Sequence, residues 1–137
     1  MTPTLPIGLI VGLENDVPLQ FGLAWKDYYT NPLQIVQWTM ASAVNHPVLS
    51  DTIERIRNKM VQTDFAKLLD EDVTALTGPG PWTDAIHASW ARIGVNWVDM
   101  RDFGLKSRVI GDQLVLPTVG FAWVFFILNI AWPLNAH

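Results

Sequence analysis

The sequence contains no cysteine, and this absence excludes both a disulfide framework and a thiolate metal site. Charged residues make up only 16% of the 137 positions, and the Lys and Arg residues among them form no cluster. The chain therefore lacks the electrostatic footprint that binding to a phosphate backbone requires, and we expect no nucleic acid among its partners. Half of the residues are hydrophobic, which at this length predicts one domain around one modest core.

Long apolar runs are also lacking. The most apolar stretch covers residues 114–132, but Pro117 and Gly120 interrupt its start, and the unbroken part, residues 121–128, is too short to span a bilayer. A membrane contact through residues 114–132 and a buried element therefore remain as alternatives. At the other end of the chain no Lys or Arg precedes the first apolar segment, and we expect no signal peptide or anchor there.

The first apolar segment, residues 7–13, is short and unbroken, which is typical of a strand buried on both faces. It ends in Glu14-Asn15-Asp16, so that carboxylates directly follow the predicted strand. In α/β sheets, ligands usually bind at this edge. The alternative, which the residues alone leave equally open, is a solvated turn that only ends the strand.

Residues 47–60 show the clearest helical spacing in the chain. Pro47 fits an early helical position, and we interpret His46 before it as a capping residue, because no second metal ligand lies at a suitable spacing. The apolar side chains that share one stripe of this predicted helix are Leu49, Ile53, Ile56 and Met60.

A second helix is predicted after Thr77-Gly78-Pro79-Gly80-Pro81, which is the strongest turn signal in the sequence. We expect Asp84 in its first turn, where a carboxylate favours the positive end of the helix dipole. A glycine-rich turn at a helix start can present free N–H groups to an anion. Spacing alone favours the simpler alternative of a helix cap, with Trp82 in the core. The stripe of this helix consists of Trp82, Ile86, Ser89, Trp90 and Ile93.

Residues 33–43 have the composition of a strand and residues 109–117 that of a hairpin or a strand, while residues 20–31, 63–76 and 94–107 are predicted connections. The connection 63–76 includes Asp70-Glu71-Asp72, which has the D-x-D spacing of many cation sites in nucleotide-sugar enzymes. Such a site needs carboxylates that are fixed at a strand end beside a phosphate pocket. This triplet lies within a polar run, and we interpret it as a solvated charge run.

Five segments, in this order, resemble the fungal initiating α-1,6-mannosyltransferases, a family of glycosyltransferases with a DXD sugar-binding region. Together they cover about residues 7–118, and T-G-P-G-x-W-T-D-A is the most distinctive of them. The segments are Val11-Gly12-Leu13-Glu14, Gln34-Ile35-Val36-Gln37-Trp38-Thr39, His46-Pro47-Val48-Leu49, Thr77-Gly78-Pro79-Gly80 with Trp82-Thr83-Asp84-Ala85, and Gly111-Asp112-Gln113-Leu114-Val115-Leu116-Pro117.

The resemblance implies an α/β domain with a partial GT-A, Rossmann-like, nucleotide-sugar transferase fold. Residues 1–118 would be the carboxy-terminal part of the catalytic domain, and residues 119–137 a hydrophobic tail that does not match the family. It also implies GDP-mannose as donor, an N-glycan core as acceptor, a manganese ion held by the DXD aspartates, and a Golgi membrane location. The family places its DXD upstream of the strand that matches residues 7–13. We therefore expect this chain to lack the metal site and to be an incomplete, inactive form of the enzyme.

The site expected from the resemblance rests on the chemistry of glycosyl transfer, which builds positive charge on the sugar ring and negative charge on the diphosphate. Carboxylates stabilise the first charge and turn amides the second, so the glycine-proline turn should fold back toward Glu14. Two other hypotheses are a non-catalytic glycan- or partner-binding remnant and a small membrane-associated protein. The expected catalytic residues are Glu14, Asp16 and Asp84, and the expected substrate-binding residues are Thr77, Gly78, Gly80 and Trp82.

Overall fold

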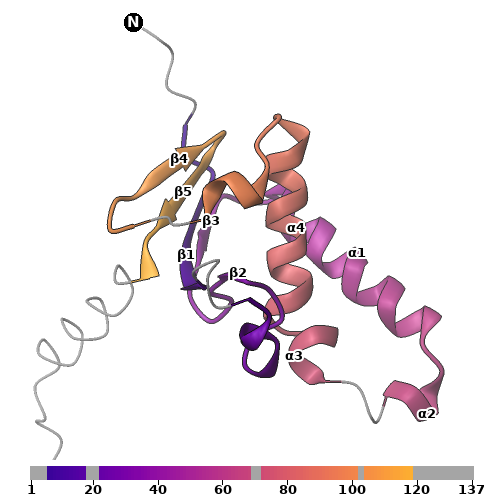
Figure 1. Ribbon diagram of the computed structural model, residues 1–137. Helices are drawn as coiled ribbons and strands as arrows, with labels where there is room; N and C mark the ends of the chain where they lie inside the picture. Colours follow the sequence, from indigo (N-terminus) through magenta and orange to yellow (C-terminus); the bar gives the residue numbers. More distant parts are fainter. Residues whose placement is uncertain (1–5, 18–21, 69–71, 102–103, 119–137) are drawn as a thin grey trace, which may run out of the picture.

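In the computed structural model, the described residues are 6–17, 22–68, 72–101 and 104–118. They form one sheet, with helix α4 (Pro79–Arg92) packed against it and helix α1 (Pro47–Gln62) packed on α4 (Figure 1). The predicted α/β class is confirmed. The expected tail of residues 119–137 lies outside the described residues, and so does most of the stretch 114–132. None of the helices in the described part of the chain is long and apolar enough to cross a membrane.

Strand β1 (Leu9–Asp16) is the centre of a mixed sheet with the order β2-β1-β5-β4. Strand β5 (Gln113–Leu116) pairs with β1 in parallel, and β4 (Arg108–Ile110) pairs with β5 antiparallel, as the hairpin predicted near residues 109–117 requires. Strands β2 (Leu33–Ile35) and β3 (Ala41–Ser42) pair antiparallel with the two halves of β1. The single strand expected within residues 33–43 is therefore two short strands.

The predicted end of the first strand is wrong by three residues. Asn15 pairs with Gln34 and Asp16 with Leu33, so that β1 continues through the acidic residues instead of ending before them. The pairing register shifts between Leu13 and Asn15, because two steps along β1 correspond to one step along β2. Glu14 is thus the extra residue of a β-bulge, a device that bends a strand and changes the direction of a side chain.

Helix α4 supplies the largest side chains of the core. Trp82, Ile86 and Trp90 follow one another at four-residue spacing and are at most 3% exposed, which confirms this part of the predicted stripe. Ile93 is 56% exposed, because the helix ends at Arg92 before it. The apolar partners of these side chains from the sheet are Leu9, Val11, Leu13, Leu33, Ile35, Ile110 and Val115.

Hydrogen bonds fix the start of α4 on β2. The Thr83 hydroxyl accepts the backbone N–H of Ile35 at 3.0 Å, and the indole N–H of Trp82 donates to the backbone oxygen of Val36 at 2.8 Å. These bonds satisfy buried groups at the end of a short strand, where the ladder gives the backbone no partner. They position the first two turns of α4 beside the C-terminal half of β1.

Thr83→Val should lower the free energy of unfolding by about 1–3 kcal/mol, because a fully buried side chain keeps its shape while the N–H of Ile35 loses its acceptor. Urea unfolding followed by circular dichroism measures this loss. Thr77→Val is the control, since the same change at an exposed residue is expected to cost less than about 0.5 kcal/mol. Equal losses for the two variants would contradict the role given to the Thr83 bond.

Helix α1 begins where the sequence predicts, and the imidazole Nδ1 of His46 accepts the N–H of Val48 at 3.3 Å, which confirms the capping role. The predicted apolar stripe is confirmed at Leu49, which packs against the core, and wrong at Ile53 and Met60, which are 68% and 47% exposed. The reason is that α1 packs on α4 and not on the sheet, so only a narrow strip of it is covered. Val48, in its first turn, is its buried residue.

Two short helices, α2 (Phe65–Leu68) and α3 (Val73–Leu76), lie within the charged connection. Of the acidic triplet only Asp72 is among the described residues; it is exposed and caps α3, accepting hydrogen bonds from the hydroxyl and amide of Thr74 at 2.7 and 2.9 Å. The hydroxyl bond first, and then the amide bond, lower the pKa of Asp72. Asp72 is therefore an exposed capping residue, as the interpretation as a solvated charge run expects.

Candidate functional site

The carboxylate of Glu14 lies at the C-terminal end of β1 on the bulge, and its residue is exposed. Its Oε2 accepts a hydrogen bond from the side-chain amide of Gln34 in β2, at 2.6 Å. Gln34 itself is only 3% exposed. An accessible carboxylate at a strand end is therefore fixed by a buried neighbour, in the position where α/β sheets usually bind ligands.

The carbonyl end of the Gln34 side chain is held by the loop that precedes β2. Its Oε1 accepts the N–H and the hydroxyl of Thr30, both at 2.8 Å, and the N–H of Asn31 at 3.3 Å. The side-chain amide of Asn15 donates to the backbone oxygens of Asn31 and Pro32 at 3.3 and 3.1 Å. The loop is thus tied to both strands, and the amide of Gln34 has one orientation that satisfies its neighbours.

Asp84 reaches the same loop from α4. The amide of Asn31 donates to its Oδ1 at 3.5 Å, the longest contact of the group. Asp84 is not in the first helical turn, as expected from the sequence, but in the second, because α4 already begins at Pro79. We call the joined set of Glu14, Gln34, Thr30, Asn31 and Asp84 the carboxylate network. Through Asp84 it brings the second turn of α4 close to the end of β1, as we expected from the family resemblance.

Asp16 has a different environment from Glu14. Its Oδ1 accepts a hydrogen bond from the Nε of Arg101 at 3.1 Å, and the two side chains are 12% and 9% exposed. This ion pair ties the end of β1 to the segment after the 3-10 helix η3 (Trp97–Met100). Removal of one partner of such a buried pair is strongly destabilising, so a structural role accounts for Asp16 in this arrangement.

The expected substrate-binding residues of the glycine-proline turn are divided between surface and interior. Thr77 is exposed and Gly78 partly exposed, whereas Gly80 and Trp82 are buried. The two glycines allow α4 to approach α3: a Cβ on Gly78 would lie 2.8 Å from the Cα of Thr74, and one on Gly80 3.2 Å from the Cα of Ala75. Close packing therefore explains both glycines, and contact of the turn with a substrate stays a prediction.

His87 lies one turn after Thr83 on α4 and is 8% exposed. Its ring stacks on Trp97, with centroids 5.1 Å apart and planes inclined by 5°, and the two residues line a pocket of about 250 Å³. Burial lowers the pKa of His87 to about 4, and a hydrogen bond with the backbone of Leu33 opposes this shift. The ring is thus neutral near pH 7, and its hydrogen bond with Leu33 connects α4 to β2.

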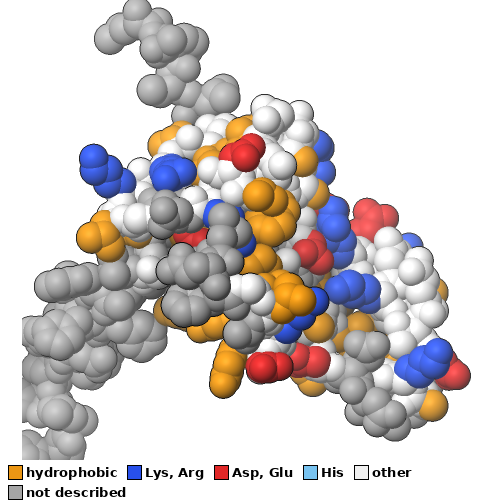
Figure 2. Space-filling view, in the orientation of Figure 1, with side chains coloured by type: hydrophobic (Ala, Val, Ile, Leu, Met, Phe, Trp, Pro, Cys, Tyr) orange, Lys and Arg blue, Asp and Glu red, His pale blue; other side chains and the backbone are white. Residues whose placement is uncertain are grey.

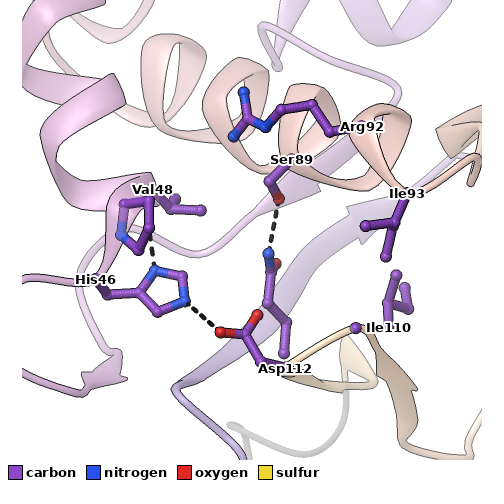
Figure 3. A pocket seen from close by; sticks show the side chains of 10 residues that line it. His46, Val48, Ser89, Arg92, Ile93, Ile110 and Asp112 are labelled. Carbon is purple, nitrogen blue, oxygen red and sulfur yellow. Dashed lines mark hydrogen bonds and ion pairs between the residues drawn. The ribbon is translucent and has the colours of Figure 1, made fainter. Parts of the chain in front are cut away.

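A larger pocket, of about 350 Å³, lies at the opposite end of the sheet (Figure 3). There the Nε2 of His46 contacts Asp112 Oδ2 at 3.1 Å, and the Gln113 amide donates to the Ser89 hydroxyl at 2.7 Å. Because Nδ1 of His46 accepts the N–H of Val48, Nε2 carries the proton and donates to Asp112. These bonds join α1, α4 and the β4-β5 hairpin, and the pocket is not part of the carboxylate network.

A metal ion does not fit the carboxylate network. In the part of the chain that the structure describes, no three His, Cys, Asp or Glu side chains lie close enough to hold one. Glu14 and Asp84 face amides and Asp16 faces a guanidinium, which are hydrogen-bond donors and not fellow ligands. On the face that Figure 2 shows, Lys and Arg side chains are scattered and gather into no large basic patch.

Curated fungal proteins are similar to this chain in sequence and support the family resemblance. The initiation-specific α-1,6-mannosyltransferase of Schizosaccharomyces pombe is 36% identical over 121 residues, which cover 85% of this chain and 30% of the relative. This chain is homologous to a segment of the fungal α-1,6-mannosyltransferases. The mannosyltransferase of Candida albicans is 31% identical over 143 residues, covering 84% of this chain and 35% of its own length. A Saccharomyces cerevisiae protein named as a glycosyltransferase, HOC1, is 30% identical over 128 residues, with 84% and 31% covered.

The chain thus spans about a third of the length of each mannosyltransferase relative that it matches. No family model matches it, and neither does any solved structure. The homology confirms the family resemblance over most of this chain. The activity of the whole enzyme is a separate question, because two thirds of the relatives lie outside the matched segment.

Sequence reasoning missed three residues that organise this region: Gln34, Arg101 and His87. Gln34 stands in one of the five segments of the resemblance, but a glutamine in a short strand carries no sign of its partners. Arg101 is 85 positions from Asp16, and no local pattern connects the two. His87 falls on the buried side of the helical stripe, three positions before Trp90, and this spacing was the available signal for its burial.

Proposed function

We propose that this chain forms the carboxylate-bearing side of the sugar site in a GT-A-type mannosyltransferase, which transfers mannose from GDP-mannose to an N-glycan core in the Golgi. The observation that supports the proposal most is the carboxylate network. It joins Glu14 and Asp84, which belong to two segments of the family resemblance, through Gln34 of a third. We take mannose as the transferred sugar because two of the homologues are named mannosyltransferases.

In this proposal Glu14 stabilises the positive charge that develops on the mannose ring as the bond to the diphosphate breaks. Its carboxylate is exposed, and its orientation is fixed before the sugar arrives, so no reorganisation is needed at the moment of transfer. Asp84 is partly exposed and hydrogen-bonded more loosely, which suits a carboxylate that accepts hydrogen bonds from sugar hydroxyls. Asp16 does neither, since Arg101 holds it.

The diphosphate and the manganese ion belong, in this proposal, to the part of the enzyme outside the matched third. The carboxylates among the described residues form no metal site. Each role that we propose for this chain therefore concerns the sugar. When bound, manganese would neutralise the leaving diphosphate. Glu14 acts at the other end of the bond that breaks.

A transfer assay tests the proposal with a hybrid enzyme, in which this chain replaces its homologous segment in the S. pombe relative. Glu14→Gln should lower kcat/KM for mannose transfer by at least about tenfold, because the amide keeps the shape but not the charge. Asp99→Asn is the matched control, since it removes a carboxylate that is exposed on η3 and outside the network. Activity that is equal in wild type and Glu14→Gln, or no mannose transfer by the wild-type hybrid, would contradict the proposed function.

A further inference from the structure

Glu14 gains its fixed orientation from a side chain that does not itself reach the solvent. As the extra residue of the bulge, Glu14 has no residue of β2 directly opposite it, and cross-strand packing cannot hold its side chain. The bond that holds it is the 2.6 Å contact with the amide of Gln34. A charged acceptor makes this the strongest class of hydrogen bond in the network.

The amide of Gln34 cannot turn away from Glu14. Three donors, from Thr30 and Asn31, converge on its Oε1, and an amide oxygen has only two lone pairs to share among them. A flipped amide would place its NH2 group against these donors and its oxygen against the Glu14 carboxylate. Both contacts would then be repulsive, so the loop before β2 dictates where the N–H of Gln34 points.

We propose that Gln34 is a positioning residue, which aims the carboxylate of Glu14 at the mannose ring and couples it through Asn31 to Asp84. The inference rests on the proposed function, because positioning has a meaning only if Glu14 acts on a sugar. It adds a residue whose role is not chemical but geometric: Gln34 is buried and contacts Glu14 instead of substrate. Misplacement by about 1 Å is enough to slow a reaction severely.

The contact is tested first in the 137-residue chain, by thermal unfolding. Gln34→Glu keeps the oxygen that Thr30 and Asn31 need but turns a carboxylate toward Glu14, and it should lower Tm by roughly 5–10 °C. Adding Glu14→Gln reverses donor and acceptor, since the new amide of residue 14 can donate to the new carboxylate of residue 34. We expect the double variant to recover at least half of the lost Tm.

Gln113→Glu is the matched control for the exchange. Gln113 is also buried, at 4% exposed, but its amide donates to Ser89 and its oxygen accepts from Trp90, far from Glu14 along the sheet. Its loss of Tm should not be recovered by Glu14→Gln. If the exchange fails to recover Tm in Gln34→Glu, or recovers it equally in Gln113→Glu, the contact does not hold Glu14 and the inference falls whatever the activity.

The positioning role is tested next in the hybrid enzyme by separating kcat from KM. Gln34→Glu should lower kcat by about tenfold or more with KM changed by less than about threefold, and the exchanged variant should stay slow although its Tm recovers. An unchanged kcat in Gln34→Glu would leave Gln34 a purely structural residue and overturn the inference. Recovery of Tm together with no transfer by the wild-type hybrid would overturn the proposed function and the positioning role, while the contact itself would stand.

Discussion

Trp90→Ala is expected to lower the free energy of unfolding by about 3–5 kcal/mol. Trp90 is fully buried between α4 and the sheet, so the substitution opens a large cavity in the middle of the core. It also removes the indole N–H that donates to Oε1 of Gln113 at 3.0 Å, one of two hydrogen bonds of Gln113 that tie α4 to β5. Urea unfolding followed by far-ultraviolet circular dichroism, which does not depend on the lost fluorophore, measures the change.

Trp38→Ala provides the control for the loss of Trp90. It removes the same ring from a position that is 52% exposed, and we expect a loss of about 1 kcal/mol or less. The difference between the two variants then reports the buried packing of Trp90 together with its hydrogen bond to Gln113, and not the loss of a tryptophan ring as such. Comparable losses at positions 90 and 38 would mean that α4 is not packed on the sheet as described.

The stability of the protein should fall by about 3 kcal/mol as the pH falls from 6.5 to 4, through His87 alone. In the unfolded chain His87 takes up its proton near pH 6.5, whereas burial between α4 and η3 lowers its pKa in the folded chain to about 4. The unfolded state therefore binds more protons in this window, and the free energy of unfolding rises with pH across it. The contribution becomes constant about one pH unit above 6.5, where the ring is neutral in both states.

His87→Phe isolates this contribution, since it keeps a ring on Trp97 but removes the titrating group. The difference between wild type and variant, measured by urea unfolding at several pH values, should slope between pH 6.5 and 4 and become level about one pH unit above 6.5. Carboxylates that titrate in the same range cancel in the difference. A difference that does not change with pH would mean that His87 is open to water in the folded protein.

The helices and the hairpin were accessible from the sequence because their signals are local. His46 as the N-cap and Pro47 as the first helical residue mark the start of α1. In α4, Trp82, Ile86 and Trp90 repeat at helical spacing. The stripe on α1 failed in part, for a reason that spacing cannot reveal. Periodicity says which residues share a face, but the face of α1 that meets α4 depends on how the layers stack.

The acids of the candidate site were visible in the sequence, but the hydrogen bonds that orient them were not. Carboxylates after a buried run are visible in the sequence, and Glu14 was found in this way. The bulge at Glu14 depends on the pairing register with β2, which lies twenty residues away in the sequence. The orientation of the Gln34 amide, which donates to Glu14, depends on three donors from the loop before β2. Asp16 looked equivalent to Glu14 in the sequence, but in the structure Asp16 pairs with Arg101, whereas Glu14 accepts a hydrogen bond from an amide.

The most direct test of the account is a double-mutant cycle of Glu14→Gln and Asp84→Asn on mannose transfer by the hybrid enzyme. If the carboxylate network joins both residues in one site, the combined loss of kcat/KM will fall short of the product of the two single losses by about fivefold or more. If the two losses simply multiply, the carboxylates act independently, and the single joined site described here does not exist.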